Sequence, residues 1–378
     1  MRIATSVRFV AGCENGHPAT GAITPRAAGT GAMISRMPVE FLFLSQDDVV
    51  AAGGTDMPAV IDVIEGAFRL KAEGQVINPN KVLLTWSDEP GTQELHGRIM
   101  AMPAWVGGEW DVAGLKWIPS VPANLGRGLP RANAIVLLSD RETGLPVAVL
   151  DGTVISAMRT GAVTGVAIRH LASEDARTAG LLGAGVLTRT QLMALAATRP
   201  GLELARVYDP NTARTEALLG ELAPALPFPV AVARSEREAC ECADIIIPST
   251  LAVTPTIDKE WVPAGGLVVL VSSLDGPEDL HTVTDLLVVD DRDHEGTADT
   301  RYLRRLRDAG IDAADDAVDL AEVVSGQHPG RTGEEQRIVC SPVGLGMDDV
   351  VTAAYVLRNA KERGLGTPLR LRDEPLWR

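Results

Sequence analysis

The sequence is poor in the residues that build disulfide frameworks and metal centres. It has 4 cysteines and 6 histidines in 378 residues. The cysteines are too few and too scattered for a disulfide framework in a chain of this length. Cys240 and Cys242 form a CxC pair, but no second ligand pair lies nearby and no histidines occur at metal-ligand spacing. We therefore expect no metal, and we interpret the CxC pair as part of a segment in which a helix runs into a strand.

Positive charge and long apolar runs are also scarce. The formal net charge is -15, and an acidic surface repels nucleic acids and anionic membranes. No segment approaches the ~18 uninterrupted apolar residues that a membrane span needs. The sequence therefore predicts a cytoplasmic protein that binds neither nucleic acid nor membrane. An anionic cofactor remains compatible with this charge, because local basic groups and helix ends set the field inside a cleft.

The composition is that of a globular protein with two domains. Hydrophobic residues make up 46% and charged residues 22% of the chain, which is enough apolar material for a sizeable core. Residues 1–37 show no clear periodicity and lack the apolar core and cleavage pattern of a secretory signal. We expect this segment to be a disordered tail or the product of an upstream start codon, with Met37 as the alternative start.

Two patterns of secondary structure follow one another along the chain. Residues 38–176 contain short extended runs separated by Gly, Pro, Asn and Asp, and these predict an antiparallel or mixed sheet. A long helix rich in small residues is expected over 152–172. Residues 177–323 alternate apolar strands with helices, which is typical of a doubly wound parallel sheet. We expect the remainder, 324–378, to be helical and to pack back on the first domain.

A glycine-rich turn marks a candidate dinucleotide site. Gly183 and Gly185 stand where an apolar strand meets a helix, and Thr188 is small enough for that helix to pack on the sheet. The helix start, which includes Val186 and Leu187, would face the phosphates with unpaired N–H groups.

Two further residues strengthen this prediction. Asp209 ends the second strand, where a carboxylate can bind both ribose hydroxyls and repel a 2′-phosphate, which favours NAD over NADP. Thr250 ends the fourth strand, at the sheet edge where a doubly wound fold binds its ligand. The alternative is a domain of the same shape that has lost its cofactor or that binds another nucleotide.

Three cationic residues occupy unusual positions in the first domain. Arg98 lies between extended runs, Lys116 lies inside an apolar strand, and Arg159 lies in the helix of small residues. Each has an ordinary alternative: Arg98 as a surface charge, Lys116 extending its ammonium to the rim, and Arg159 capping a carbonyl or bridging subunits.

Several motifs together resemble the ornithine cyclodeaminase/mu-crystallin family. The resemblance runs from about residue 40 to the C-terminus. It rests on these segments: GLKWIPSVPAN, LSDRETGLPVAVLDGTVISAMRTGAVT, GLLGAGVLTRTQLMAL, the VDD at the sixth strand and VGLGMDDVVTAAYV.

The resemblance implies an α/β fold in which a doubly wound Rossmann sheet, over 177–323, is inserted into a mixed α+β domain. That domain, over 38–176 and 324–378, would bind the substrate and form a homodimer. Arg98, Lys116 and Arg159 would meet the substrate carboxylate, with Arg159 also touching the cofactor and Lys116 also relaying protons. Asp275 would be the catalytic aspartate, although cyclodeaminases typically read Gly-Asp-x-Pro-Gly-Lys there and this segment lacks the lysine.

The implied residues suit amine-to-imine chemistry. Hydride leaves an α-carbon only from a neutral amine, so a base must first take a proton. A nearby carboxylate stabilises the iminium product, and arginine is geometrically suited to grip the substrate carboxylate.

Within the family, several segments are similar to one branch. They include RIMAMP, GGEWDVAGLKWI and SAMRT. The branch contains the N-(2-amino-2-carboxyethyl)-L-glutamate dehydrogenases and proteins labelled as a tyramine oxidase subunit. The function expected first is an NAD-dependent oxidoreductase acting on the C–N bond of an amino acid or N-substituted amino acid through an imine. An ornithine cyclodeaminase (a lyase), a ketimine reductase or alanine dehydrogenase, and a non-catalytic NAD(H)-binding accessory protein are the alternatives.

Overall fold

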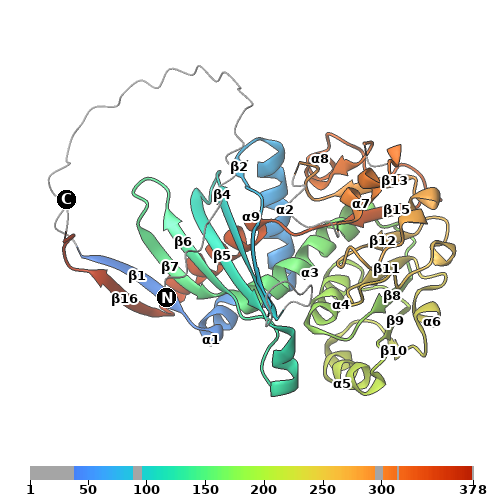
Figure 1. Cartoon of the computed structure of the whole chain (residues 1–378), viewed down its shortest axis with the longest axis horizontal. Helices are drawn as coiled ribbons and strands as arrows, with labels where there is room; N and C mark the ends of the chain where they lie inside the picture. The colour runs from blue at the N-terminus through green and yellow to red at the C-terminus, as the bar shows by residue number, and fades with distance from the viewer. Residues whose placement is uncertain (1–37, 88–95, 294–300, 313–314, 377–378) are drawn as a thin grey trace, which may run out of the picture.

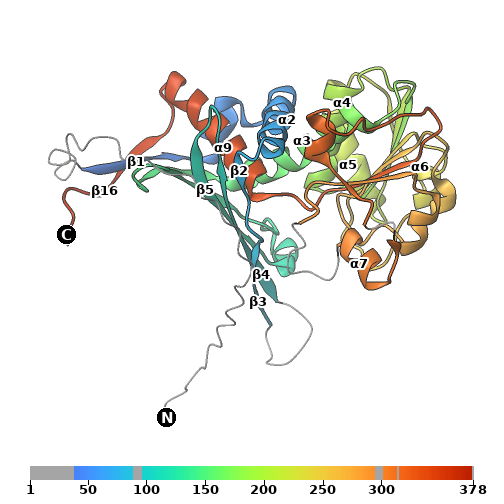
Figure 2. The same cartoon turned by 90° about the horizontal axis from the view of Figure 1, so that it is seen from above.

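The structure is a computed structural model that describes residues 38–87, 96–293, 301–312 and 315–376. The predicted tail, 1–37, lies outside these residues. In the described part, the strands form two sheets of eight strands each. Figure 1 shows them side by side, with the helix α3 (Gly152–Leu171) between them, and the view in Figure 2 agrees.

The first sheet is mixed, as the sequence predicts. Its neighbouring strands pair antiparallel except β1 and β7, which are parallel. The strand β16, which pairs with β1 at the sheet edge, was not expected from the sequence. The order is β16 (Thr367–Arg372), β1 (Val39–Leu44), β7 (Pro146–Asp151), β6 (Ile135–Asp140), β5 (Val112–Ser120), β4 (Gly97–Val106) and β2 (Val76–Ile77), with β3 (Val82–Trp86) also on β4.

Three long helices cover one face of this sheet, which we call the inner face. They are α2 (Met57–Ala72), α3 and α9 (Gly346–Arg363). A Cβ on Gly114 of β5 would lie 2.9 Å from Val350 of α9, so glycine lets that helix sit close to the strands. The C-terminal helix thus packs back on the first sheet, as predicted. No helix in the described ranges is long and apolar enough to cross a membrane.

The second sheet is entirely parallel and doubly wound. Its order is β10 (Val230–Val232), β9 (Leu204–Tyr208), β8 (Thr178–Leu182), β11 (Ile245–Pro248), β12 (Leu267–Val269), β15 (Ile338–Ser341), β13 (Leu286–Val289) and β14 (Val318–Asp319). Its helices are α4 (Val186–Thr198), α5 (Thr212–Leu222), α6 (Glu236–Cys240), α7 (Tyr302–Asp308) and α8 (Leu320–Val324). The chain order reverses direction between β8 and β11, and doubly wound sheets bind ligands at such a point.

The smaller elements connect these layers. They are α1 (Gln46–Val49), the π-helical turn η2 (Val50–Gly54) and the 3-10 turns η3 (Pro122–Arg127), η4 (Ala223–Ala225), η5 (Lys259–Trp261) and η6 (Glu278–Val283).

The return of the chain to the first domain differs from the predicted boundary. We expected helical structure after residue 324, but β15 is a buried strand of the parallel sheet between β12 and β13. The chain therefore leaves this sheet at Ser341 and reaches the first sheet at α9. A run of four buried residues is too short to show a strand pattern in the sequence, which is why the prediction missed it.

Direct helix packing brings the two sheets together. A Cβ on Gly161 of α3 would lie 2.6 Å from the backbone oxygen of Thr190 in α4. Only glycine permits such a close approach of the two backbones. Helix α4 begins at the glycine-rich turn, so the helix that carries Arg159 packs directly on the helix that follows this turn.

Candidate functional site

The glycine-rich turn has the backbone geometry that dinucleotide binding requires. Gly183 has a φ of +92°, a conformation that favours glycine, and a Cβ there would lie 3.0 Å from the carbonyl oxygen of Ser249. Gly185 and Val186 are exposed and Leu187 is half-buried, at the start of α4. No side chain from the described residues caps this helix, so its first N–H groups are available to an anion.

Thr188 and Asp209 hold the turn in place. The buried hydroxyl of Thr188 donates to the carbonyl oxygen of Gly183 at 2.8 Å. Asp209 Oδ2 accepts from the Ala184 N–H at 2.9 Å, so the carboxylate predicted to bind ribose lies directly beside the turn.

Asp275 makes its side-chain hydrogen bonds with two threonines that follow strand β11. It is fully buried, and its carboxylate accepts hydrogen bonds from the Thr250 N–H at 3.0 Å and from the hydroxyls of Thr250 and Thr256 at 2.5 and 2.8 Å. Among the described residues no hydrogen bond or ion pair connects it with Lys116 or Arg159. In this structure it anchors Thr250 at the point where the chain order of the parallel sheet reverses.

A buried carboxylate connects Lys116 with Arg159. Asp349 Oδ2 lies 2.8 Å from Lys116 Nζ, and its Oδ1 accepts from Arg159 Nε at 3.1 Å. Lys116 Nζ also donates to the hydroxyl of Ser156 at 3.1 Å. Lys116 is 1% exposed and Asp349 is fully buried, so strand β5, helix α3 and helix α9 meet at these charges.

The neighbouring Asp348 adds a second buried carboxylate. Its Oδ2 accepts from the Leu345 N–H at 2.8 Å and lies 3.6 Å from Arg159 Nη1. Its Oδ1 is buried without a hydrogen-bond partner in the described part of the chain. Burial raises the pKa of Asp348 to about 7. The pKa of Lys116 is lowered to about 8, because burial and the charge of Arg159 together outweigh the opposing effect of Asp349. Burial thus shifts the pKa values of both groups toward neutral pH.

A third cation, Lys81, which was not singled out from the sequence, lies beside this cluster. Its Nζ donates to the carbonyl oxygen of Val343, and burial together with the nearby Arg301 and Arg159 lowers its pKa. Lys81 directly precedes β3, and Val82 of β3 pairs with Ala101 of β4. The next residue of β4, Met102, pairs with Lys116 of β5. Lys81 therefore lies one strand from Met102 and two strands from Lys116 on the first sheet.

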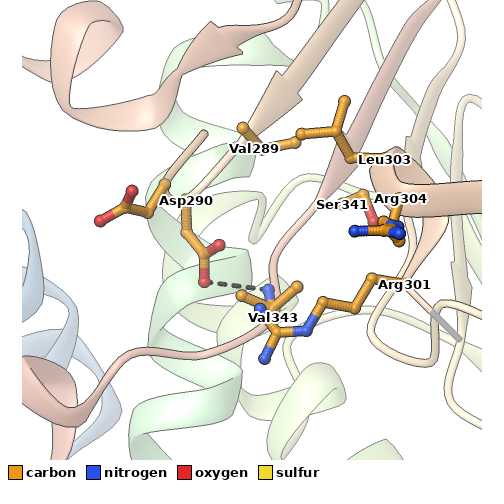
Figure 3. A pocket seen from close by; sticks show the side chains of 8 residues that line it. Val289, Asp290, Arg301, Leu303, Arg304, Ser341 and Val343 are labelled. Atoms are coloured by element: carbon orange, nitrogen blue, oxygen red, sulfur yellow. Dashed lines mark hydrogen bonds between the residues drawn. The ribbon is translucent and has the colours of Figure 1, made fainter. Parts of the chain in front are cut away.

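Asp290 connects this region with the parallel sheet. Its buried Oδ2 accepts from the N–H groups of Val343 and Gly344 at 2.9 and 2.6 Å, and Figure 3 shows its carboxylate directed at the Val343 N–H. A pocket at this point is lined by Val289, Asp290, Asp291, Arg301, Leu303, Arg304, Ser341 and Val343. The pocket thus opens at the carboxyl ends of β13 and β15, next to the residue that Lys81 contacts.

Arg98 lies on the same face of the sheet but apart from the cluster. It pairs with Ser120, whereas Lys116 pairs with Met102 four residues further along β4. At about 3.3 Å per residue the separation along the strand is roughly 13 Å. Arg98 is exposed, and no hydrogen bond or ion pair joins its side chain to another residue in the described ranges.

These features place a cluster of buried cationic side chains on elements that pack next to the helix of the glycine-rich turn. Lys81, Lys116 and Arg159 supply positive charge, and the packing of α3 on α4 brings Arg159 toward the turn. Asp349 and Lys81 were missed because their roles depend on contacts between distant segments. The sequence signal that could have pointed to Asp349 is the acidic pair Asp348 and Asp349 at the start of the amphipathic C-terminal helix.

A family comparison agrees with this arrangement. Residues 40–364 match the family described as ornithine cyclodeaminase/mu-crystallin. The chain belongs to this family. The N-((2S)-2-amino-2-carboxyethyl)-L-glutamate dehydrogenase of Staphylococcus aureus is 28% identical to this family member over 88% of the chain and 99% of the relative.

Solved structures agree as well. The Thermococcus litoralis Delta(1)-pyrroline-2-carboxylate reductase, in complex with NADH and L-proline, has a TM-score of 0.78 and 31% identity over 86% of this chain and 99% of its own. An archaeal alanine dehydrogenase dimer with bound NAD has a TM-score of 0.77 and 27% identity over 88% of this chain and 99% of its own.

The contacts of Asp275 predict that it acts through Thr250. Asp275→Asn should weaken NAD binding about tenfold, since it disturbs three hydrogen bonds that hold this edge of the sheet. Thr256→Ala, which removes one of them, should weaken binding less. Equilibrium titration of NAD and steady-state kinetics check this. A large loss of kcat with unchanged NAD affinity would instead support the catalytic role predicted from the family resemblance.

The shared carboxylate of Asp349 predicts a large effect on stability. Asp349→Asn should lower the free energy of unfolding by about 3 kcal/mol, because it leaves two buried cations without their anion. Denaturant unfolding measures this. Asp279→Asn is the control, because Asp279 pairs with Lys259 at the surface with its side chain 57% exposed, and its loss should cost about 1 kcal/mol or less. Equal effects of the two variants would contradict the central position of Asp349.

Proposed function

We propose that this family member is an NAD-dependent oxidoreductase that acts on the C–N bond of an amino acid through an imine. The observation that carries the proposal is the buried Lys116–Asp349–Arg159 network, in which Arg159 lies on helix α3, and α3 packs on the helix α4 that follows the glycine-rich turn. Hydride would pass between the nicotinamide and the carbon that bears the substrate nitrogen. Relatives of this chain include a dehydrogenase and a reductase of amino-acid C–N bonds, which supports the proposal.

The substrate carboxylate would bind to Lys116, Arg159 and Lys81. Charge-assisted hydrogen bonds of this kind are stronger than neutral ones, and arginine can bind a carboxylate with two parallel bonds. Because Asp349 already holds Lys116 and Arg159 in position, little conformational freedom is lost when the substrate binds. The α-carbon would therefore be fixed beside the cofactor.

Lys116 is also the residue best suited to exchange the amine proton. A general base works best when its pKa lies near the working pH, and burial lowers the pKa of Lys116 to about 8. Its neutral form would keep an N–H hydrogen bond to the substrate carboxylate while its lone pair accepts a proton from the substrate ammonium before hydride transfer. In the reverse direction its protonated form would return this proton to the new amine.

The proposed cofactor is NAD. The turn at Gly183 and Gly185 would hold the pyrophosphate at the start of α4, and Asp209 would accept hydrogen bonds from the ribose hydroxyls. Solved relatives that hold NADH or NAD support this assignment.

Oxidation of an N-substituted or simple amino acid is the preferred reaction, followed by hydrolysis of the imine to a 2-oxo acid and an amine. The segment around Asp275, VSSLDGPEDL, lacks the lysine typical of cyclodeaminases. This chain matches nearly the whole length of the Staphylococcus aureus relative, which is a dehydrogenase of an N-substituted glutamate.

The pH dependence of turnover tests the proposal. With a panel of amino acids and N-carboxyalkyl amino acids, the rate of NAD reduction should rise with pH through about 8, because the neutral form of Lys116 is needed. The rate of imine reduction should fall over the same range. Absorbance at 340 nm measures both. Lys116→Met should reduce turnover at least about a hundredfold while NAD binding stays unchanged.

The other outcomes distinguish the alternatives. Ammonia release without net NADH would identify a cyclodeaminase. No change of absorbance at 340 nm in either reaction direction, despite NAD binding, would favour a non-catalytic NAD-binding protein. Full activity of Lys116→Met would remove the assigned role of this lysine.

We also propose that the first sheet forms a homodimer through its outer face, opposite to α9. One row of paired residues crosses four strands there: Val82, Ala101, Trp117 and Ile135. Val82, Trp117 and Ile135 are 64%, 39% and 49% exposed. An apolar row this wide on a free sheet face is typical of an association surface. The dimeric state of the archaeal alanine dehydrogenase supports the proposal.

Sedimentation velocity tests the dimer. The protein should sediment as a dimer, and Trp117→Glu should shift it to the monomer, because a buried unpaired charge is costly at an interface. Leu376→Glu is the control, because Leu376 is 82% exposed near the end of the described chain and does not lie in the row. A dimer that survives Trp117→Glu together with Ile135→Glu would contradict the proposal.

A further inference from the structure

Three buried carboxylates share the guanidinium of Arg159 as a counterion. Asp349 Oδ1 accepts from Arg159 Nε at 3.1 Å, and Asp348 Oδ2 lies 3.6 Å from Arg159 Nη1. Asp290, which follows β13, is the third, and all three carboxylates are fully buried. Although burial opposes it, the charges of Asp349, Asp348 and Asp290 raise the pKa of Arg159. The three carboxylates thus compete for one guanidinium.

Asp348 is the least compensated of the three. Asp349 contacts two cations, Lys116 and Arg159. Asp290 has one oxygen without a hydrogen-bond partner among the described residues, but its other oxygen accepts two backbone N–H groups and two further cations act on it. Asp348 accepts a single backbone N–H, and its distance to Arg159 exceeds that of a hydrogen bond. Its Oδ1 is buried without a partner in the described part of the chain.

The groups that act on Asp348 come from several elements. The charged ones are two cations and two carboxylates: Lys116 of β5, Arg159 of α3, Asp349 of α9 and Asp290 after β13. Asn78, which lies before β3, is neutral, and its Oδ1 accepts from the Met347 N–H next to Asp348. Lys81 acts on Asp290. Both cations that act on Asp348 already contact Asp349, so Asp348 has no cation of its own. Burial raises the pKa of Asp348 to about 7, although Arg159 lowers it.

A ligand carboxylate at Lys116 and Arg159 would add another negative charge to this buried cluster. When two carboxylates share a site, the pKa of one of them rises strongly, because like charges at short distance repel each other in a medium of low polarity. This effect should fall on Asp348, since its charge has the fewest favourable contacts. Protonation of Asp348 would also end its competition with the ligand for Arg159.

We infer that Asp348 takes up a proton from solvent at Oδ1 when a ligand carboxylate binds to Lys116 and Arg159. This inference rests on the proposed function, since it takes these two cations as the carboxylate subsite. Asp348 is thus a positioning residue, because in its neutral form it leaves Arg159 to the ligand and keeps the charge of the site balanced. Since binding then requires a proton, the affinity for carboxylate ligands should fall as the pH rises above about 7.

Calorimetric titration of the NADH-loaded protein counts this proton. The probes are pyruvate, 2-oxoisovalerate and phenylpyruvate, which carry a carboxylate but no amine that could titrate, and each is compared with its uncharged amide. Titration at about pH 7.5 in buffers of different ionisation enthalpy, all without a primary amine, gives the number of protons taken up. At least one acid should bind with an uptake of roughly half a proton to one proton, whereas its amide should bind without uptake.

Asp348→Asn should reduce this uptake to less than half and weaken the pH dependence of binding. Between pH 7 and 8 the dissociation constant of the acid should rise roughly five- to tenfold in the unmodified protein and about threefold or less in the variant. The change that remains in the variant belongs to Lys116. Asp279→Asn is the matched control, because Asp279 pairs with Lys259 at the surface, and it should behave as the unmodified protein.

Infrared difference spectroscopy identifies the group that holds the proton. Binding of the acid to the unmodified protein should produce the C=O stretching band of a protonated carboxyl group, which shifts in D2O and is absent in Asp348→Asn. Asp348→Glu, which keeps the carboxyl group, should retain the proton uptake and shift this band, and it serves as the second variant if Asp348→Asn does not fold.

Several results would overturn the inference. One is the absence of proton uptake when the acids bind to the unmodified protein, and another is a carboxyl band that survives Asp348→Asn, which would assign the proton to another carboxylate. If Lys116 took the proton, no carboxyl band would appear, and the uptake would persist in Asp348→Asn because the loss of a nearby negative charge lowers the pKa of this lysine. Failure of all the acids to bind would remove the carboxylate subsite and the inference with it.

The test separates this inference from the proposed function. If the acids bind with proton uptake at Asp348 but no amino acid exchanges hydride with the cofactor, the inference stands and the proposed reaction fails. If amino acids are oxidised and the acids bind without proton uptake, the reaction stands and the inference fails. Circular dichroism and NADH fluorescence show whether each variant is folded and loaded.

Discussion

The Asp349 carboxylate is the interaction on which the site depends. It holds Lys116 of strand β5 and Arg159 of helix α3 from the start of helix α9. These elements come from three distant parts of the chain, and all three side chains are buried. Burying charges is costly unless they are paired with good geometry, so this arrangement persists only when the helices and the sheet pack correctly. The fold and the charge of the site are therefore coupled.

The same constraint explains how the two sheets cooperate. The close contact of Gly161 with α4 fixes the distance between the cationic cluster and the glycine-rich turn. On the other side, Asp290 binds the backbone where the chain leaves the parallel sheet, and Lys81 contacts the same segment. The segment at Val343 therefore contacts Lys81 beside the first sheet and Asp290 at the end of a strand of the parallel sheet, and it connects the cationic cluster with the second domain.

The sequence predicted those features that depend on neighbouring residues. The turn at Gly183 follows from a strand, glycines and a helix in immediate succession, and Lys116 drew attention because a charge inside an apolar strand is unusual. The acidic partner of Lys116 could not be predicted, because it is separated from Lys116 by more than half of the chain. Strand β15 was missed for a related reason, since four buried residues carry no periodicity. The position of Asp275 after a strand was predicted correctly, but its hydrogen bonds with Thr250 and Thr256 could not be predicted without the fold.

A crystal structure with NADH and an amino acid bound is the most direct test of the proposed site. We expect the amino acid carboxylate to lie within hydrogen-bond distance of Lys116 Nζ and the Arg159 guanidinium, with the α-carbon facing the nicotinamide ring. An amino acid bound away from both cations, or a nicotinamide ring directed away from them, would contradict it.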